Sequence, residues 1–106
     1  MKFENEKLVR DKIPALISTS GRTPQVRIAN SDERMSLLKN KLLEETHEFI
    51  ETGAIEELAD IFQVIHAICR EKKITFSTLE EIRHLKLITN GGFDEGIVLK
   101  LDPKNG

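Results

Sequence analysis

The 106-residue sequence has little of what several common protein classes require. It contains no Trp or Tyr, five Phe and a single cysteine, Cys69. One cysteine cannot build a disulfide framework within the chain, so we expect Cys69 to be a core thiol on an apolar helical face. Few aromatic residues beside 32% charged residues are typical of a helical bundle built on Leu and Ile, and not of a β-sandwich.

Charge and hydropathy exclude further classes. A formal net charge of -2 provides no basic face, so no nucleic-acid partner is expected. No apolar run approaches the roughly 20 residues of a membrane span, and no signal peptide opens the chain. The sequence therefore predicts a cytoplasmic protein without a membrane partner. Its length predicts one domain, 1–106. A chain of this size is not expected to cover all of its apolar helices by itself, so we expect a homo-oligomer.

Apolar residues recur at intervals of three and four and predict an all-α fold with four helices. Asn30 with Glu33, and Ser77 with Glu80, have the spacing of a capping box. Gly53 is suited to a left-handed C-cap between the second and third helices. The expected helices begin at Asp11, at Asn30 or Ser31, at Ile55 and at Ser77, and they end near Ser20, Glu51, Arg70 and Thr89.

One segment departs from the helical pattern. Residues 25–28 alternate polar and apolar side chains like a short strand, after Pro24. Gly96 to Leu101 is the other β-like run. We therefore expect a minor two-stranded β piece that ties the ends of the domain together.

Four acids lie on or beside the apolar faces of the second and third helices. Glu45 falls inside the apolar stripe of its helix and Glu48 on its shoulder, while Glu57 and Asp60 occupy the corresponding positions on the next helix. Buried, unpaired carboxylates are costly, and a divalent metal offsets that cost. Because the short connection makes the helices antiparallel neighbours, the two pairs predict a hard-cation site. An all-oxygen set favours magnesium or manganese over iron or zinc.

Two other interpretations of this region remain. Glu44-x-x-His47 is the pattern of di-iron carboxylate bundles, but those need it on two helices, and we expect His47 to be a surface residue. A non-catalytic helical interaction module explains the amphipathic helices, although not acids on their buried faces. A nucleophilic mechanism has little support, because the chain has no Gly-x-Ser-x-Gly elbow and no Gly-rich phosphate loop.

The acidic motifs also carry a resemblance. Glu-Glu-x-x-Glu at 44–48 followed by Glu-x-x-Asp at 57–60 resembles the signature of the MazG-like all-α nucleoside triphosphate pyrophosphohydrolases, a superfamily that includes the phosphoribosyl-ATP pyrophosphohydrolases of histidine biosynthesis. Lys-Leu-Val-Arg-Asp-Lys-Ile-Pro at 7–14, and Gly-Gly-Phe at 91–93 with Gly-Ile-Val-Leu at 96–99, look like its small single-domain housecleaning branch. The resemblance covers nearly the whole chain.

That resemblance implies a MazG-like bundle, dimeric or tetrameric, that splits a nucleoside triphosphate between the α- and β-phosphates to give a monophosphate and pyrophosphate. Phosphoribosyl-ATP hydrolysis remains an alternative, since both substrates present the same triphosphate. The present chain departs from the superfamily pattern because only eight residues separate Glu48 from Glu57. It departs from the single-domain branch because Asn90 stands where an Arg often precedes the two glycines.

The resemblance further implies roles for individual residues. Mg²⁺, or Mn²⁺, would be bound by Glu45, Glu48, Glu57 and Asp60. Glu44 would position the attacking water or hold Lys41, and it is grouped with Glu45 as a catalytic residue. Contacts to the nucleotide substrate would come from Lys7, Arg10, Lys41, Arg83 and Lys86.

Overall fold

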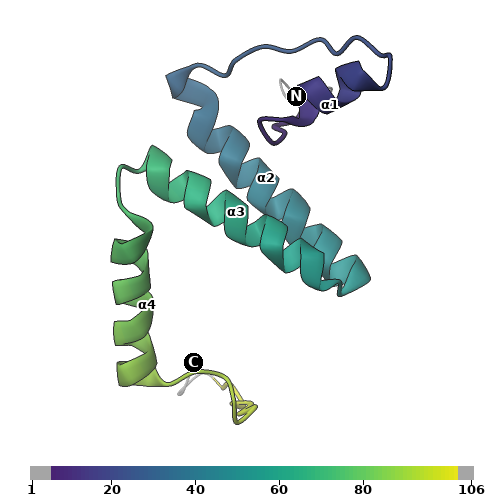
Figure 1. Ribbon diagram of the computed structural model, residues 1–106. Coiled ribbons are helices and arrows are strands. Elements are labelled where there is room, and N and C mark those ends of the chain that lie inside the picture. Colours follow the sequence, from purple (N-terminus) through teal and green to yellow (C-terminus); the bar gives the residue numbers. More distant parts are fainter. Residues whose placement is uncertain (1–5, 103–106) are drawn as a thin grey trace. The chain divides into compact units, whose positions relative to one another are not determined.

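The computed structural model describes residues 6–102, and in this range the chain forms four α-helices and no strand. They are α1 (Ile13–Thr19), α2 (Ser31–Thr52), α3 (Ile55–Glu71) and α4 (Phe76–Asn90), as Figure 1 shows. The predicted all-α class is confirmed. The chain divides into two compact units, Met1–Ile74 and Thr75–Gly106, and the expectation of a single domain stays a prediction. Among the described helices, none combines the length and the apolar character needed to cross a bilayer.

Both predicted ends of α2 are confirmed. The Asn30 side chain accepts hydrogen bonds from the amides of Asp32 and Glu33 at 3.0 and 3.1 Å, and the Glu33 carboxylate accepts one from the Asn30 amide at 3.1 Å. This reciprocal capping box satisfies amides that have no partner within the helix. At the other end Gly53 adopts a left-handed conformation with φ 66°, which costs glycine little. Only Gly53 and Ala54 separate α2 from α3, so the chain turns back on itself.

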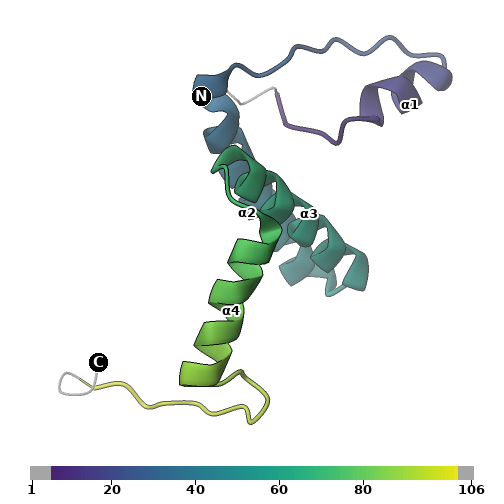
Figure 2. The same cartoon turned by 60° about the vertical axis from the view of Figure 1, so that its left-hand side comes forward.

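The helical hairpin of α2 and α3 forms the small core of the first unit, and Figures 1 and 2 show these two helices side by side. Its buried apolar residues are Leu37, Leu38, Val64 and Cys69. The burial of Cys69 confirms the predicted core thiol. The apolar pattern of α3 is wider than its buried face, because Leu58 and Phe62, which continue that pattern, are 42% and 52% exposed. A single partner helix covers one seam, which is narrower than the whole apolar face.

Two predicted helix starts are wrong by one or two residues. Lys12, and not Asp11, is the N-cap of α1, and no side chain caps this helix. Pro14 lies in its first turn, where a backbone amide is not needed. At α4 the cap is Thr75 instead of Ser77, and its hydroxyl accepts a hydrogen bond from the Thr78 amide at 3.0 Å. Thr75 therefore accepts a hydrogen bond from an amide that has no partner within the helix, which is the role predicted for Ser77.

The predicted β piece is also wrong, since residues 22–30 and 96–102 carry no regular structure. A lone two-stranded ribbon is marginally stable in water, so alternation alone does not secure it. In the first of these segments the side chain of Arg27 instead makes ion pairs with Glu6 and Glu33.

Candidate metal centre

Three carboxylates meet where α2 and α3 face one another. Glu45 comes from α2, and Glu57 and Asp60 come from adjacent turns of α3. One carboxylate oxygen of each lies within 4.8 Å of the other two. Oxygens that share one Mg²⁺ at about 2.1 Å are about 3 Å apart in cis and about 4 Å in trans. The three acids are therefore close enough to bind a common ion after small side-chain movements.

Two oxygen atoms in this cluster have no donor. Glu45 Oε1 and Glu57 Oε2 are buried, and neither accepts a hydrogen bond from any described residue. The whole Glu45 residue is only 5% exposed. A buried acceptor without a donor costs on the order of 1–3 kcal/mol, and more when it is charged. A divalent cation would satisfy both atoms, and the all-oxygen donor set fits Mg²⁺ or Mn²⁺.

Neighbouring groups shift the pKa values of two adjacent acids in opposite directions. Burial raises the pKa of Glu45, and the carboxylate of Glu48 raises it further, against the opposing effect of Lys41. Burial also acts to raise the pKa of Glu44, but hydrogen bonds and charge from Lys41 and Lys7 outweigh it, so the pKa of Glu44 is lowered. Glu44 thus stays readily ionised, whereas the ionisation of Glu45 is opposed by its surroundings.

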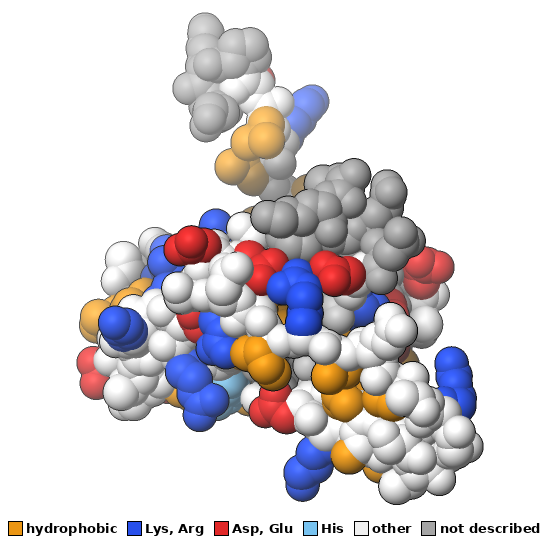
Figure 3. Space-filling model, turned by 90° about the horizontal axis from the view of Figure 1, so that it is seen from above, with side chains coloured by type: hydrophobic (Ala, Val, Ile, Leu, Met, Phe, Trp, Pro, Cys, Tyr) orange, Lys and Arg blue, Asp and Glu red, His pale blue; other side chains and the backbone are white. Residues whose placement is uncertain are grey.

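Three of the predicted substrate-binding cations lie at these acids. Lys41 Nζ is 2.9 Å from Glu44 Oε2 and 3.2 Å from Glu45 Oε2. Lys7 Nζ lies 3.5 Å from Glu44 Oε2. Arg10 Nη2 donates to Asp60 Oδ1 at 2.7 Å. Basic and acidic side chains also lie next to one another on the face drawn in Figure 3.

These three cations differ in their freedom to meet a ligand. The side chain of Lys41 is 16% exposed, and although burial acts to lower its pKa, hydrogen bonds to Glu44 and Glu45 raise it overall. The side chains of Lys7 and Arg10 are 64% and 54% exposed. Lys41 is therefore committed to the acids, while Lys7 and Arg10 lie at the open edge of the cluster.

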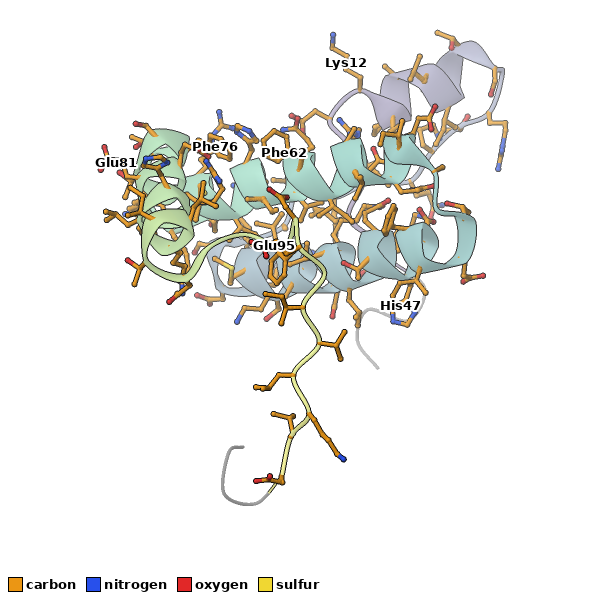
Figure 4. All side chains as sticks on the ribbon, turned by 90° about the horizontal axis from the view of Figure 1, so that it is seen from below. Lys12, His47, Phe62, Phe76, Glu81 and Glu95 are labelled. Carbon is orange, nitrogen blue, oxygen red and sulfur yellow. The ribbon has the colours of Figure 1, made fainter. Side chains whose placement is uncertain are left out.

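Glu48 and His47 lie outside the group of three. Glu48 is exposed and borders Glu45, and its role as a metal ligand stays a prediction. His47 is exposed and points away from α3 (Figure 4), as expected of a surface residue. The all-oxygen interpretation therefore agrees with the geometry better than the di-iron one.

The remaining predicted cations belong to α4, in the second unit. Arg83 is paired with Glu80 of the same helix, with Nε and Nη2 at 2.5 to 3.0 Å from its carboxylate oxygens. Lys86 borders a shallow hollow together with Leu85 and Asn90. Contacts of Arg83 and Lys86 with a substrate stay predictions.

A second ionic cluster was missed in the sequence. Arg27 bridges Glu6 and Glu33 beside the start of α2. The capping-box spacing drew attention to Glu33, but it gave no sign of Arg27 as a partner. The alternation of residues 25–28 pointed instead to a strand.

No family model matches the chain, and no solved structure matches it. A protein of Mycolicibacterium smegmatis, described as uncharacterized, is 54% identical over 41 residues. This match covers 39% of the present chain and 42% of that relative, so the chain spans less than half of the relative's length. The likeness concerns a segment, and it assigns no activity to this chain.

Proposed function

We propose that this chain is a Mg²⁺-dependent nucleotide pyrophosphohydrolase, which converts a nucleoside triphosphate to a monophosphate and pyrophosphate. The observation that supports it best is the meeting of three carboxylates within 4.8 Å, two of which carry a buried oxygen that accepts no hydrogen bond from residues 6–102. Exposed cations at the edge of the same cluster suit a ligand that brings both a metal and negative charge, as a polyphosphate does.

In this proposal Glu45, Glu57 and Asp60 hold the ion. When bound, Mg²⁺ supplies charge neutralisation at the phosphates and lowers the pKa of a coordinated water. Lys41 holds Glu44 and Glu45 in place from its partly buried position. Glu44, whose lowered pKa keeps it ionised at neutral pH, offers an acceptor for a proton of the attacking water.

Lys7 and Arg10 are the residues that we assign to the outer phosphates. Both reach the cluster from the segment that precedes α1, and both keep about half or more of their side chain exposed. A guanidinium matches two phosphate oxygens at once, so Arg10 is the stronger candidate for a directed contact. Pyrophosphate would leave toward these cations while water approaches from the side of the acids.

Two alternatives make different predictions. Phosphoribosyl-ATP presents the same triphosphate to the acids, so the choice of nucleotide depends on the pocket for the base. The second alternative, a non-catalytic interaction module, is favoured by the exposed apolar side chains of the hairpin. They include Leu43, Ile50, Ile55, Leu58 and Phe62. The expected dimer or tetramer would cover the same side chains. Such a module needs no metal.

The test is release of pyrophosphate from canonical, modified and phosphoribosylated nucleotides, with Mg²⁺ or with a chelator. We expect turnover with Mg²⁺ only, and in ¹⁸O-water the label should enter the monophosphate. Glu57→Gln should abolish turnover, whereas Glu56→Gln, on the exposed neighbouring position, should retain it. Full activity in the chelator, label in pyrophosphate, or an active Glu57→Gln enzyme would contradict the proposal.

A further inference from the structure

Arg27 forms a bridge between two segments that are distant in sequence. Its guanidinium donates to Glu33 at 2.6 and 3.0 Å and to Glu6 at 3.1 and 2.9 Å. A guanidinium presents its donors in a rigid planar fork, so one Arg can hold two carboxylates in fixed positions. The pairing holds the pKa of Glu6 below its usual value.

One end of this bridge is firmly anchored. Glu33 is 7% exposed, and besides Arg27 it accepts a hydrogen bond from the Asn30 amide at 3.1 Å within the capping box of α2. The position of Glu33 is therefore set by the helix itself. Arg27 in turn fixes Glu6 against this point, and so closes the loop formed by residues 6–27 at its base.

The loop has few other attachments. α1, which lies within it, buries none of its residues, and among the described helices only α2 and α3 pack on each other. The contacts of the loop with the acids of the hairpin are Lys7 with Glu44 at 3.5 Å and Arg10 with Asp60 at 2.7 Å. Single exposed ion pairs of this kind are individually weak, whereas the similarly exposed pair of Arg27 with Glu6 is bidentate, with two donors on two oxygens.

The bridge and the two contacts are also close in sequence. Lys7 follows Glu6 directly, and Arg10 comes four residues after it. An extended chain advances at most about 3.5 Å per residue, so fixing Glu6 confines the backbone of Lys7 to a few ångströms and that of Arg10 to about 14 Å. Without the bridge, the side chains of Lys7 and Arg10 can occupy a wider range of positions. Ordering them on a ligand then costs more conformational entropy.

We infer that Arg27 is a positioning residue, which holds Lys7 and Arg10 at the edge of the acid cluster by clamping Glu6 to Glu33. This rests on the proposed function, since Lys7 and Arg10 are the cations assigned to the substrate phosphates. The ligand class is a polyphosphate bound together with a divalent ion. Sharing Asp60 with an ion weakens its pair with Arg10, whereas the clamp uses none of the three ligand carboxylates.

The test uses the full chain and variants of the clamp. Arg27→Ala removes the guanidinium that pairs with the buried Glu33 and endangers folding, so the main variant is Glu6→Gln, which keeps the Arg27–Glu33 pair. Arg27→Lys is the second variant, because an ammonium cannot serve both carboxylates in the same way. Arg22→Gln removes a charge from an exposed position of the same loop and is the matched control.

The first readout is amide hydrogen exchange, which needs no activity. In Glu6→Gln and Arg27→Lys, exchange should accelerate at the amides of Ile13 and Leu16, which donate hydrogen bonds to Arg10 O and Lys12 O, while α2 and α3 stay protected. The second readout is kinetic: KM for the best nucleotide, and the Kd of its non-hydrolysable analogue with Mg²⁺, should rise about fivefold with kcat within about twofold. Arg22→Gln should leave all of these unchanged.

A double-mutant cycle separates positioning from general stability. In an Arg10→Gln background, Glu6→Gln should raise KM by less than it does in the wild-type chain, because part of its effect passes through Arg10. Additive effects on KM, or unchanged exchange at the amides of Ile13 and Leu16, would overturn the inference even in an active enzyme. A wild-type chain that neither hydrolyses nor binds nucleotides would instead overturn the proposed function and this role together.

Discussion

Glu33 and Glu45 belong to the same helix and are buried to nearly the same extent, with 7% and 5% of their surface exposed. Their hydrogen bonding differs. Both oxygens of Glu33 accept hydrogen bonds, from Arg27 and from the Asn30 amide. In Glu45, Oε2 lies 3.2 Å from Lys41 Nζ, while Oε1 has no donor among the described residues.

The difference shows that burial alone does not identify a functional acid. A buried carboxylate with all its hydrogen bonds made can be explained by the architecture around it. A buried carboxylate with an oxygen left over, beside two other acids, retains an electrostatic cost that a cation would relieve. Glu33 is thus a structural acid and Glu45 a candidate metal ligand, although both are buried glutamates of the same helix.

The largest expected effect is on turnover. Glu45→Gln should lower kcat/KM by at least about 100-fold, the upper end of what the loss of an outer-shell partner costs a metal site. Glu33→Gln should act through the clamp, with KM raised about fivefold and kcat kept. Steady-state kinetics at saturating Mg²⁺ measures both, with Glu51→Gln as an exposed control on α2. Equal losses in the two variants would remove the distinction.

Metal-dependent stability is expected to change next most. At a Mg²⁺ concentration of 100 Kd the wild-type chain should gain about 2.7 kcal/mol of unfolding free energy. Glu33→Gln should keep this gain and Glu45→Gln should lose it, as followed by thermal melting with and without the ion. Ca²⁺ should also stabilise the protein but support turnover poorly, because its looser coordination misplaces the reacting groups. An undiminished gain in Glu45→Gln would exclude this residue as a ligand.

In a chelator the two substitutions should change stability in opposite directions. Glu33→Gln removes charge-assisted hydrogen bonds and should lower the free energy of unfolding by about 2 kcal/mol. Glu45→Gln removes a charge from a repelling cluster and should leave the protein as stable or more so. Urea denaturation with unchanged slopes would give both values. A destabilised Glu45→Gln protein would mean that Lys41 compensates the charge of Glu45 fully.

The smallest effect concerns pH. Since the pKa of Glu45 is raised above its unfolded value of 4.5, the folded state binds more protons than the unfolded one between the two values. Relative to Glu45→Gln, the wild type should therefore lose stability as pH rises from 4.5 through the raised pKa. Glu44 has a lowered pKa, so its contribution should be present above 4.5 and be lost as pH falls through that lower value. Denaturation in a chelator across this range tests the opposite signs.

The elements that sequence patterns predicted well are those governed by local rules. The capping box at Asn30, the left-handed Gly53 and the burial of Glu45 follow from spacing within one helix or turn. The width of the buried face of α3 does not, because it depends on how many neighbours cover the helix. For the same reason Phe62 matches the apolar pattern and yet is half exposed.

Within the site, the sequence placed Glu45, Glu57 and Asp60 together correctly. The ion pair of Arg10 with Asp60 joins residues fifty positions apart, and no periodic pattern in the sequence predicts it. The bridge made by Arg27 is likewise a tertiary contact, formed where alternation suggested a strand. Long-range pairs of charged side chains are therefore the part of this site that required coordinates.

The tight turn at Gly53 has a consequence for the order of folding. It brings the three acids together within residues 45–60, a segment whose contacts are all short in sequence and so quick to form. Arg10, which pairs with Asp60, must instead be brought in by closing a much longer stretch of chain, against a larger entropy cost. The hairpin, in which Lys41 is the local cation, is thus expected to assemble before Arg10 reaches Asp60. During that interval a divalent ion in solution would be the readiest additional source of positive charge for the three acids.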